Sequence, residues 1–316
     1  MKKIETKNRK NGMTKKVSVI IPAYNKADLT VKTVESVLGQ TYENIEIIVV
    51  DDGSTDETAR RMASFGDKIR YIRKENGGAC NARNLGIRSA QGDYLAFLDC
   101  DDMYLPEKIE KSIKYFEKYP DTVFVYTPVY FTNGDGNILG KYPRFKKCPS
   151  GNIGKDLLLH NFVCNSTVVV KRPYFDKTGF FDETIFHPAD WDMWIRLAEK
   201  GKAGYVPEAL TLLYKPPERY SDGYLARSIK ESFFVLEKAF KRNPELRIIF
   251  RKKCFSNIHF SYALGYLRLG DHEKSKNELI LAIGENRFNI KALFLISATA
   301  AFGRHVKSGL RCVDVF

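Results

Sequence analysis

The sequence predicts an α/β fold built around a mostly parallel, doubly wound sheet and followed by an all-helical C-terminal region. Two observations lead to this prediction. Up to about residue 105, short apolar runs rich in Val and Ile alternate with amphipathic stretches, and from about Asp222 to the end the pattern is helical only. Strands that alternate with helices of roughly ten residues form βαβ units, whose parallel sheet is covered on both faces.

The individual elements follow from this alternation in chain order. The apolar runs predict strands at residues 17–21, 45–50, 69–72 and 94–98. The stretches between them predict helices at residues 27–38, 56–65 and 79–90. Further on we expect a helix at 106–119, strands at 122–130 and 166–170, and a helix at 190–201. We therefore expect three regions: a basic, disordered arm (1–16), an α/β domain (17–223) and a helical region (224–316).

The net charge of +13 is concentrated at the two ends of the chain. Residues 1–16 hold seven Lys and Arg against one acid, and residues 225–316 hold 17 against eight, so the stretch between them is close to neutral at −2. This distribution, together with the absence of any nucleic-acid-binding motif from the sequence, excludes nucleic acid as the expected partner. The basic ends favour an anionic membrane surface instead.

Other features of the composition concern the compartment. No apolar run reaches the ~18–20 residues that a membrane span needs, and the longest covers residues 292–302. The first apolar run is too short for the core of a signal peptide. The six cysteines lack the paired spacing of a disulfide framework or a zinc site. We expect a cytoplasmic protein, with its basic ends favouring attachment at the inner face of the cell membrane.

Polar motifs follow three of the predicted strands. They are Pro22-Ala23-Tyr24-Asn25, Asp51-Asp52-Gly53-Ser54 and Asp99-Cys100-Asp101-Asp102. In open α/β sheets, ligands bind beyond the carboxyl ends of the strands. We therefore expect these motifs to line one site.

The acidic motif that starts at Asp99 has two interpretations. Its carboxylates repel one another, and a hard divalent cation such as Mg²⁺ or Mn²⁺ relieves the repulsion while leaving coordination positions for substrate phosphates. Alternatively, the motif is a solvated acidic turn in which Asp102 caps the following helix. Taken alone, the motif leaves both open.

Two further motifs are equally ambiguous when taken singly. Asp51 and Asp52 either cap the next helix or accept hydrogen bonds from a nucleobase or ribose. The Gly77-Gly78 turn precedes a predicted helix, and its backbone N–H groups suit a diphosphate. A glycine pair in a turn is common without any ligand, so this motif gains meaning only from its neighbours.

Several short motifs follow one another along the chain. They are Val17-Ser18-Val19-Ile20-Ile21-Pro22-Ala23-Tyr24-Asn25, Val49-Val50-Asp51-Asp52-Gly53-Ser54, Asn76-Gly77-Gly78, Ala82-Arg83-Asn84, Phe97-Leu98-Asp99-Cys100-Asp101-Asp102, Gly179-Phe180-Phe181-Asp182-Glu183 and Asp190-Trp191-Asp192-Met193-Trp194. In order and spacing this succession resembles the family 2 glycosyltransferases over roughly residues 16–221.

The resemblance implies a GT-A fold, in which a nucleotide-binding mixed sheet is continuous with an acceptor-binding half. It implies that Tyr24 and Asp52 hold the nucleobase and that Asp99 lies at the ribose. It also implies that Asp101 ligates Mn²⁺ or Mg²⁺, with Asp99 as a second candidate ligand, and that Asp190 is the general base of an inverting transfer. The other candidates for donor binding are Pro22, Gly77, Gly78, Arg83 and Lys215.

The chain departs from the family pattern at two places. Ala189 replaces the Glu that usually precedes the base, which leaves Asp192 as a rival to Asp190. On a helix these two side chains point about 200° apart, so they cannot both face the cleft. The family's Tyr-Arg-x-His segment corresponds to residues 214–219, where Lys215 supplies a charge but the His is absent. His187 either reaches the acceptor or metal or is structural.

The C-terminal region has two interpretations. Residues 236–244 resemble the end of a tetratricopeptide repeat, and Ala282 fits a second one. Ala239 and Ala282 are 43 residues apart, whereas the repeat has about 34. A helical cover packed on the α/β domain is the alternative. Residues 227–253 carry nine Lys and Arg against three acids, interleaved with Phe, which suits anionic lipid headgroups.

From these motifs we expect a metal-dependent, hexosyltransferase-like enzyme. Displacement at an anomeric carbon needs a deprotonated acceptor hydroxyl on one face and a neutralised diphosphate on the other. The expected donor is a nucleoside-diphosphate sugar, UDP first among them. The expected acceptor is a glycan or a lipid-linked molecule in cell-surface polysaccharide synthesis. The alternative is a non-catalytic binding or scaffold protein with a degenerate transferase domain.

Overall fold

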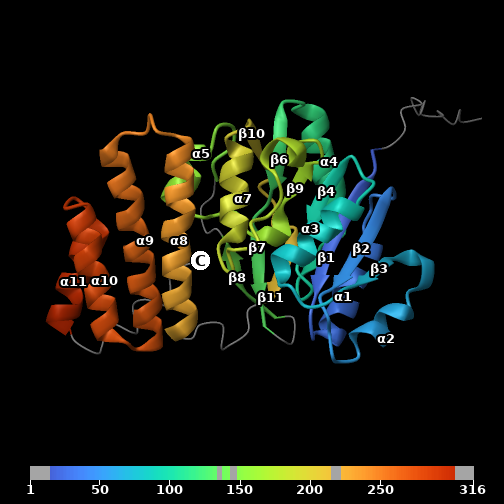
Figure 1. The fold of residues 1–316 in the computed structure, drawn as a ribbon, viewed down its shortest axis with the longest axis horizontal. Coiled ribbons are helices and arrows are strands. Elements are labelled where there is room, and N and C mark those ends of the chain that lie inside the picture. Colours follow the sequence, from blue (N-terminus) through green and yellow to red (C-terminus); the bar gives the residue numbers. More distant parts are fainter. Residues whose placement is uncertain (1–14, 134–136, 143–147, 215–221, 303–316) are drawn as a thin grey trace, which may run out of the picture.

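The computed structural model describes residues 15–133, 137–142, 148–214 and 222–302. It contains an α/β part with two sheets, and helices α8 to α11 stand beside that part (Figure 1). The expected α/β fold with a helical C-terminal region is confirmed.

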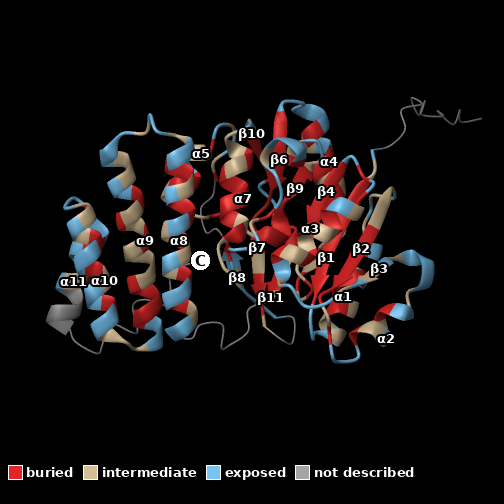
Figure 2. Cartoon of the chain, viewed as in Figure 1, coloured by how far each residue is buried: buried red, intermediate tan, exposed pale blue. Residues whose placement is uncertain are grey.

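Within the described residues, the larger sheet has seven strands and is mixed. Their order is β10 (Lys202–Tyr205), β6 (Thr122–Tyr126), β9 (Val169–Lys171), β4 (Tyr94–Phe97), β1 (Val17–Ala23), β2 (Ile45–Asp51) and β3 (Arg70–Arg73). Neighbouring strands are parallel, except that β9 runs antiparallel to β4 and β6. The interior strand β1 is buried along its whole length, as a continuous apolar run requires (Figure 2).

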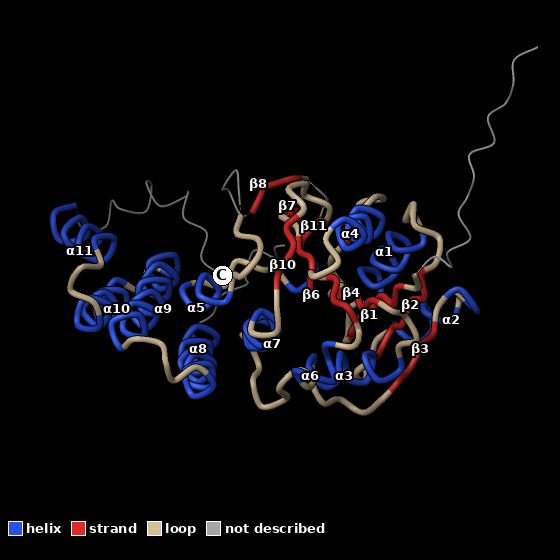
Figure 3. Tube along the Cα trace, turned by 90° about the horizontal axis from the view of Figure 1, so that it is seen from above, coloured by secondary structure: helices blue, strands red, loops and turns tan. Residues whose placement is uncertain are grey.

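Helices cover both faces of this sheet (Figure 3). One face carries α1 (Ala27–Leu38) and α4 (Lys108–Lys118), and the other carries α3 (Ala79–Ser89), α6 (Tyr174–Thr178) and α7 (Ala189–Ala198). Successive side chains of a strand point to opposite faces of the sheet, and this separates two cores. Val19 and Ile21 pack in the core of the first face, and Ile20 packs in the core of the second. Two short helices, α2 (Thr58–Ala63) and α5 (Gly154–Leu159), complete the α/β part.

A glycine sets the distance between α3 and β1. A Cβ atom added at Gly86 would lie 2.4 Å from Cγ2 of Ile20, well inside van der Waals contact. The absence of a side chain at Gly86 therefore lets α3 lie close against β1. This contact positions the start of α3, where the Gly77-Gly78 turn leads into the helix.

The smaller sheet corrects one sequence prediction. Its order is β5 (Met103–Tyr104), β11 (Thr211–Tyr214), β7 (Val129–Thr132) and β8 (Ile138–Tyr142). The single strand predicted at 122–130 is wrong, because it breaks into β6 and β7, which belong to different sheets. Pro128 lies at the break and has no N–H to donate to a strand neighbour. The strands β5, β8, β10 and β11 were not predicted, since two to five residues give too little periodicity.

The C-terminal helices are α8 (Asp222–Arg242), α9 (Ile248–Leu269), α10 (His272–Glu285) and α11 (Ile290–Phe302). Helix α9 ends at Gly270, whose φ of 83° is left-handed, and Asp271 caps α10 by accepting a 2.9 Å hydrogen bond from the backbone N of Lys274. From α8, Val235, Leu236, Ala239 and Phe240 enter the core on the α7 side of the larger sheet. Helix α8 is therefore a cover packed on the α/β part.

Ion pairs fix α8 at the same interface. Lys238 lies 2.5 Å from Asp182 and 3.1 Å from Asp192, and Arg242 lies 2.9 Å from Glu199. Part of the basic stretch 227–253 thus faces the α/β part instead of solvent. Residues 1–14 of the expected basic arm lie outside the described residues. In the part of the chain that the structure describes, no helix combines the length and the apolar character needed to cross a bilayer.

Candidate active site

The loops after β1 and β2 meet at one edge of the larger sheet. Asn25 follows β1 with a left-handed φ of 49°, and its Oδ1 accepts a 2.8 Å hydrogen bond from the backbone N of Thr55. The backbone N of Asn25 in turn donates to Oγ of Ser54 at 3.0 Å. These contacts join the two loops. Two residues predicted to bind the donor lie near this junction. Pro22 is buried within β1, and Tyr24 lies beyond the end of the strand and is 47% exposed.

Asp52 directly follows β2 at this edge of the sheet and is 3% exposed. Its carboxylate accepts hydrogen bonds from Nζ of Lys74 at 2.6 Å and from the backbone N of Gly77 and of Gly78 at 3.0 and 2.7 Å. Gly78 has a φ of 88°, a conformation that suits glycine and turns these amides toward Asp52. The two amides expected to face a diphosphate therefore hold a carboxylate instead. No sequence motif pointed to Lys74.

Asp99 follows β4 and is bound by two side chains. Its Oδ1 accepts hydrogen bonds from Nη2 of Arg83 at 2.6 Å and from Nδ2 of Asn165 at 2.9 Å. Burial lowers the pKa of Arg83, but the charge of Asp99 outweighs this effect and raises it. Nε of Arg83 and Oδ1 of Asn165 are buried without a hydrogen-bond partner among the described residues. Two polar atoms beside Asp99 are thus left unsatisfied by the described residues.

Asp101 is paired with a lysine that follows β1. Nζ of Lys26 lies 2.5 Å from Oδ2 of Asp101, whose side chain is 18% exposed. Burial lowers the pKa of Lys26, but the charge and hydrogen bond of Asp101 raise it further. A positive group therefore already lies at this carboxylate. Burial, followed by the charge of Asp101, raises the pKa of Cys100 to about 12, so its thiol stays protonated and is a poor metal ligand.

The carboxylates of Asp99 and Asp101 fit a divalent cation whose other coordination positions are filled by phosphate oxygens. No cluster of three or more metal-ligating side chains occurs in the described residues. Mg²⁺, however, is usually bound by one or two carboxylates while phosphates and water supply the other oxygens. Asp101 and Asp99 each offer a carboxylate of this kind, and in this structure a cationic side chain lies at each of them, Lys26 at Asp101 and Arg83 at Asp99.

Asp102 differs from the two neighbouring aspartates. Its carboxylate accepts hydrogen bonds from Oγ of Ser166 and from the backbone N of Tyr214, the latter at 3.0 Å. Burial, followed by the charges of Asp101 and Asp99, raises its pKa well above the usual value. The sequence offered it as a cap of the next helix, and that alternative is wrong, because its carboxylate instead binds the 3₁₀ turn at Asn165–Thr167 and the end of β11.

Asp190 and Asp192 lie in the first turn of α7 and have different surroundings. Asp192 is fully buried and forms ion pairs with Arg196 at 2.8 Å and Lys238 at 3.1 Å. Asp190 accepts a 2.7 Å hydrogen bond from the backbone N of Trp191 and lines two cavities. Of the two rivals for the base, Asp190 is thus the one with access to a ligand.

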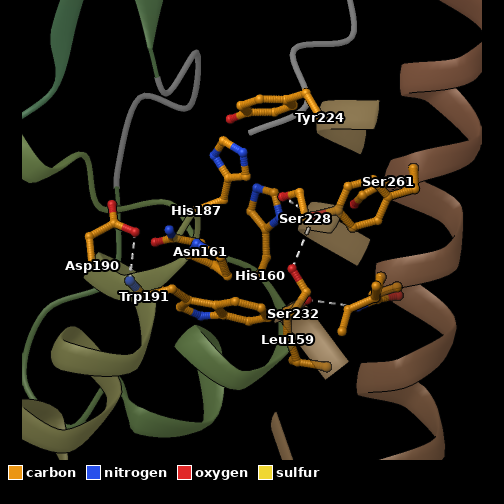
Figure 4. Close-up of a pocket in the computed structure, with 14 residues that line it drawn as sticks. Leu159, His160, Asn161, His187, Asp190, Trp191, Tyr224, Ser228, Ser232 and Ser261 are labelled. Atoms are coloured by element: carbon orange, nitrogen blue, oxygen red, sulfur yellow. Dashed lines mark hydrogen bonds between the residues drawn. The ribbon is translucent and has the colours of Figure 1, made fainter. Parts of the chain in front are cut away.

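The two cavities adjoin at Asn161 and Asp190, which line both. The first has a volume of about 90 Å³ and also contains Asp99, Asn165 and Ser166. The second has a volume of about 140 Å³ and extends to α8 and α9 (Figure 4). Nothing in the local sequence pattern pointed to Asn161 or to the residues of α8 and α9. Lys215 lies outside the described residues.

Comparisons with known proteins identify relatives of this chain in sequence and in fold. The family model described as Glycosyl transferase family 2 matches residues 18–179. An uncharacterized glycosyltransferase of Rickettsia typhi is 36% identical over 213 residues, which are 64% of this chain and 64% of that protein. The chain therefore spans slightly less than two thirds of that relative.

A relative named for its activity and a protein of solved structure extend the comparison. The UDP-Glc:alpha-D-GlcNAc-diphosphoundecaprenol beta-1,3-glucosyltransferase WfaP of Escherichia coli is 37% identical over 195 residues, covering 58% of this chain and 71% of that protein. The mannosyltransferase PcManGT of Pyrobaculum calidifontis, solved with GDP-Man and Mn²⁺, has a TM-score of 0.60 at 18% identity and covers 91% of this chain and 80% of that one. The latter likeness shows a shared fold, which confirms the GT-A expectation.

Proposed function

The chain belongs to glycosyl transferase family 2, and we propose that it transfers a sugar from a UDP-sugar to a hydroxyl of a glycan or lipid-linked acceptor in cell-surface polysaccharide synthesis. One observation carries this proposal: Asp190 lies between a cavity that contains Asp99 and a second, polar cavity. A base between donor and acceptor is the arrangement that direct displacement needs. The choice of UDP and of this pathway is supported by the name of WfaP.

The donor nucleotide is assigned to the edge formed by β1, β2 and β4. Tyr24 is exposed enough to stack on a base. Asp52 already accepts three hydrogen bonds, and a carboxylate has about four acceptor positions, so one remains for a nucleobase N–H. Gly77 and Gly78 then act by orienting Asp52, and Pro22 by shaping the end of β1. Arg83 is proposed to hold Asp99 at the donor through their ion pair, and Lys215 is proposed to add a charge there.

The leaving diphosphate requires neutralisation. Asp101, with Asp99 as a second ligand, would hold Mn²⁺ or Mg²⁺ there, and the bound cation would supply positive charge to offset the negative charge on the diphosphate. Lys26, which pairs with Asp101 in this structure, would have to give up that contact. The Mn²⁺ in PcManGT supports this assignment.

Asp190 is proposed as the general base. Its carboxylate takes the proton of the acceptor hydroxyl, the acceptor oxygen bonds to the anomeric carbon, and the bond from that carbon to the diphosphate breaks. Attack from the face opposite the leaving group inverts the anomeric configuration. Asp192 takes no part, because both of its cationic partners hold it in the core.

Two variants test this mechanism. Asp190→Asn is expected to lower transfer by about 10²–10⁴, the usual contribution of a general base, while nucleotide binding is retained. Asp101→Asn is expected to weaken nucleotide binding that depends on Mn²⁺. Release of nucleoside diphosphate from a panel of nucleotide sugars measures the first, and calorimetry with UDP and Mn²⁺ measures the second.

The exposed Asp176→Asn serves as the matched control and should leave both measurements unchanged. Undiminished turnover in Asp190→Asn and Asp101→Asn would sink the mechanism. Nucleotide binding without turnover of any donor would point to the scaffold alternative.

A further inference from the structure

The larger of the two cavities is built by both parts of the chain. The α/β part supplies Leu159, His160, Asn161, His187, Pro188, Asp190 and Trp191, and α8 and α9 supply Tyr224, Ser228, Ser232, Asn257, Ile258, Ser261 and Tyr262. In Figure 4, Asp190 lies on one side, and Ser228, Ser232 and Ser261 lie on the other. The C-terminal helices thus complete a wall of the space next to Asp190.

The charge of this cavity selects among ligands. Its described lining contains no Lys or Arg, and Asp190 is its one carboxylate. Burial, and to a smaller extent the charge of Lys291, lowers the pKa of His160, so this imidazole is neutral at pH 7. Phosphate groups are bound by cationic donors in fixed geometry. The described part of the lining therefore suits an uncharged ligand better than a phosphorylated one.

Three serine hydroxyls from α8 and α9 line the wall, and those of Ser228 and Ser232 have hydrogen-bonding capacity left. The hydroxyl of Tyr262 lies 2.7 Å from Oγ of Ser228 and 3.0 Å from Oγ of Ser232. Each serine hydroxyl has one donor and two acceptor positions, so these contacts leave capacity on both serines. Both side chains are nearly buried and hence fixed in place. A row of positioned neutral hydroxyls matches the hydroxyls of a sugar.

Aromatic rings supply the apolar part of the wall. The rings of His187 and Tyr224 have centroids 3.8 Å apart, and Trp191 is held by a 2.7 Å hydrogen bond from its Nε1 to the carbonyl of Leu157. The C–H faces of a pyranose pack on surfaces of this kind. The volume of about 140 Å³ is below the ~300–1,000 Å³ of pockets for drug-sized ligands, so it suits one ring and not a long chain.

We propose that this cavity binds the terminal, uncharged pyranose of the acceptor, and that α8 and α9 determine acceptor specificity. The inference rests on the proposed function, because it places the reacting hydroxyl at Asp190, where the two cavities adjoin. Any diphosphate or lipid of the acceptor then lies outside this cavity. The serines are positioning and specificity residues, while Asp190 remains the catalytic one.

The test fills the cavity from α8. Ser228→Leu adds volume inside it, whereas Ala226→Leu makes a similar enlargement at an exposed position of the same helix. The probes are the methyl glycosides of glucose, galactose, mannose and N-acetylglucosamine, with glucose 6-phosphate as the charged counterpart. Binding is followed by the fluorescence of Trp191, and transfer by product formation from the donor that the full-length protein turns over.

The expected result separates acceptor from donor. At least one uncharged glycoside should bind and accept sugar, and glucose 6-phosphate should not. Ser228→Leu should raise the KM for that glycoside at least about tenfold and the KM for the donor less than twofold, while Ala226→Leu should change neither. Circular dichroism of both variants checks that they are folded.

Three outcomes would overturn the inference: an acceptor KM in Ser228→Leu equal to that in Ala226→Leu, preferential binding of glucose 6-phosphate, or donor turnover without binding of any glycoside. The proposed function fails separately, if the wild-type protein releases no nucleoside diphosphate from any donor. Glycoside binding that Ser228→Leu abolishes would support the pocket even then.

Discussion

Asp190 and Asp192 carry the same functional group two positions apart, and their surroundings make them different. Asp192 has no exposed surface and lies between the cations of Arg196 and Lys238. Asp190 lines both cavities of the site. The acidic motif after β4 divides in the same way, because Asp99 lines the smaller cavity and Asp101 pairs with Lys26, while Asp102 turns inward to Ser166.

A substitution at Asp192 should therefore affect folding before chemistry. We expect Asp192→Asn to lower the free energy of unfolding by about 3–5 kcal/mol, because it leaves two cations facing a neutral group in the core. Urea denaturation measures this loss, and the exposed Asp176→Asn should stay within about 0.5 kcal/mol of the wild type. A stable Asp192→Asn protein that had lost transfer would instead make Asp192 the base.

Helix α8 belongs both to a hydrophobic core of the α/β part and to the wall of the polar cavity. It contributes Val235, Leu236 and Phe240 to the core under α7, and its Ser228 and Ser232 line the polar cavity. Removal of the C-terminal helices would expose this apolar surface, so a shortened chain is a poor probe of what they do. Point variants on α8 test the same question with the fold intact.

The pair between Lys238 and Asp182 predicts how this contact depends on pH. Burial raises the pKa of Asp182, but hydrogen bonds from Lys238 and Thr184 outweigh it and lower the pKa to about 2. Because the folded-state pKa is depressed, the stabilisation is present above the ordinary value of about 3.9 and disappears as the pH falls toward 2. The Tm difference between wild type and Lys238→Met should therefore shrink between pH 5 and pH 2.

Thermal unfolding at a series of pH values measures this difference. Lys241→Met provides the control, since Lys241 lies on the same helix and is exposed. A Tm difference for Lys238→Met that is constant over this range would show that the pair adds nothing to stability.

At the scale of the whole molecule, the three most exposed of the large apolar side chains that the structure describes lie at the far end of the helical region. Phe288, Ile290 and Phe294 are 72–77% exposed, and Arg287 and Lys291 lie beside them. Apolar side chains flanked by cations suit an anionic lipid surface. This end of the molecule is a better candidate for membrane contact than α8, part of whose basic side is paired with the α/β part.

Vesicle binding tests that assignment. The double variant Phe288→Ser and Phe294→Ser should co-sediment with anionic vesicles at least about tenfold more weakly than the wild type, since each buried Phe contributes roughly 1.5–3 kcal/mol. Tyr119→Ser, at an exposed aromatic position of the α/β part, is the control. Equal binding of all three proteins would place the membrane contact elsewhere.

Local sequence pattern was sufficient for the strands at the centre of the larger sheet and for the motifs at their ends. Buried parallel strands require continuous apolar runs, so the pattern alone located β1, β2 and β4 and the carboxylates that follow them. The motifs between Asp52 and Asp190 also indicated the family from sequence alone, because each of them is a short, continuous stretch of chain.

How those groups are used depends on tertiary contacts. The partner of the Gly77 and Gly78 amides, the inward turn of Asp102 and the burial of Asp192 all involve side chains that lie far away in the sequence. The cavity wall formed by Ser228 and Ser232 depends on the packing of α8 against α7. Contacts of this kind leave no periodic signal, because they join segments whose separation in the chain is set by the fold and not by the repeat of a helix or strand.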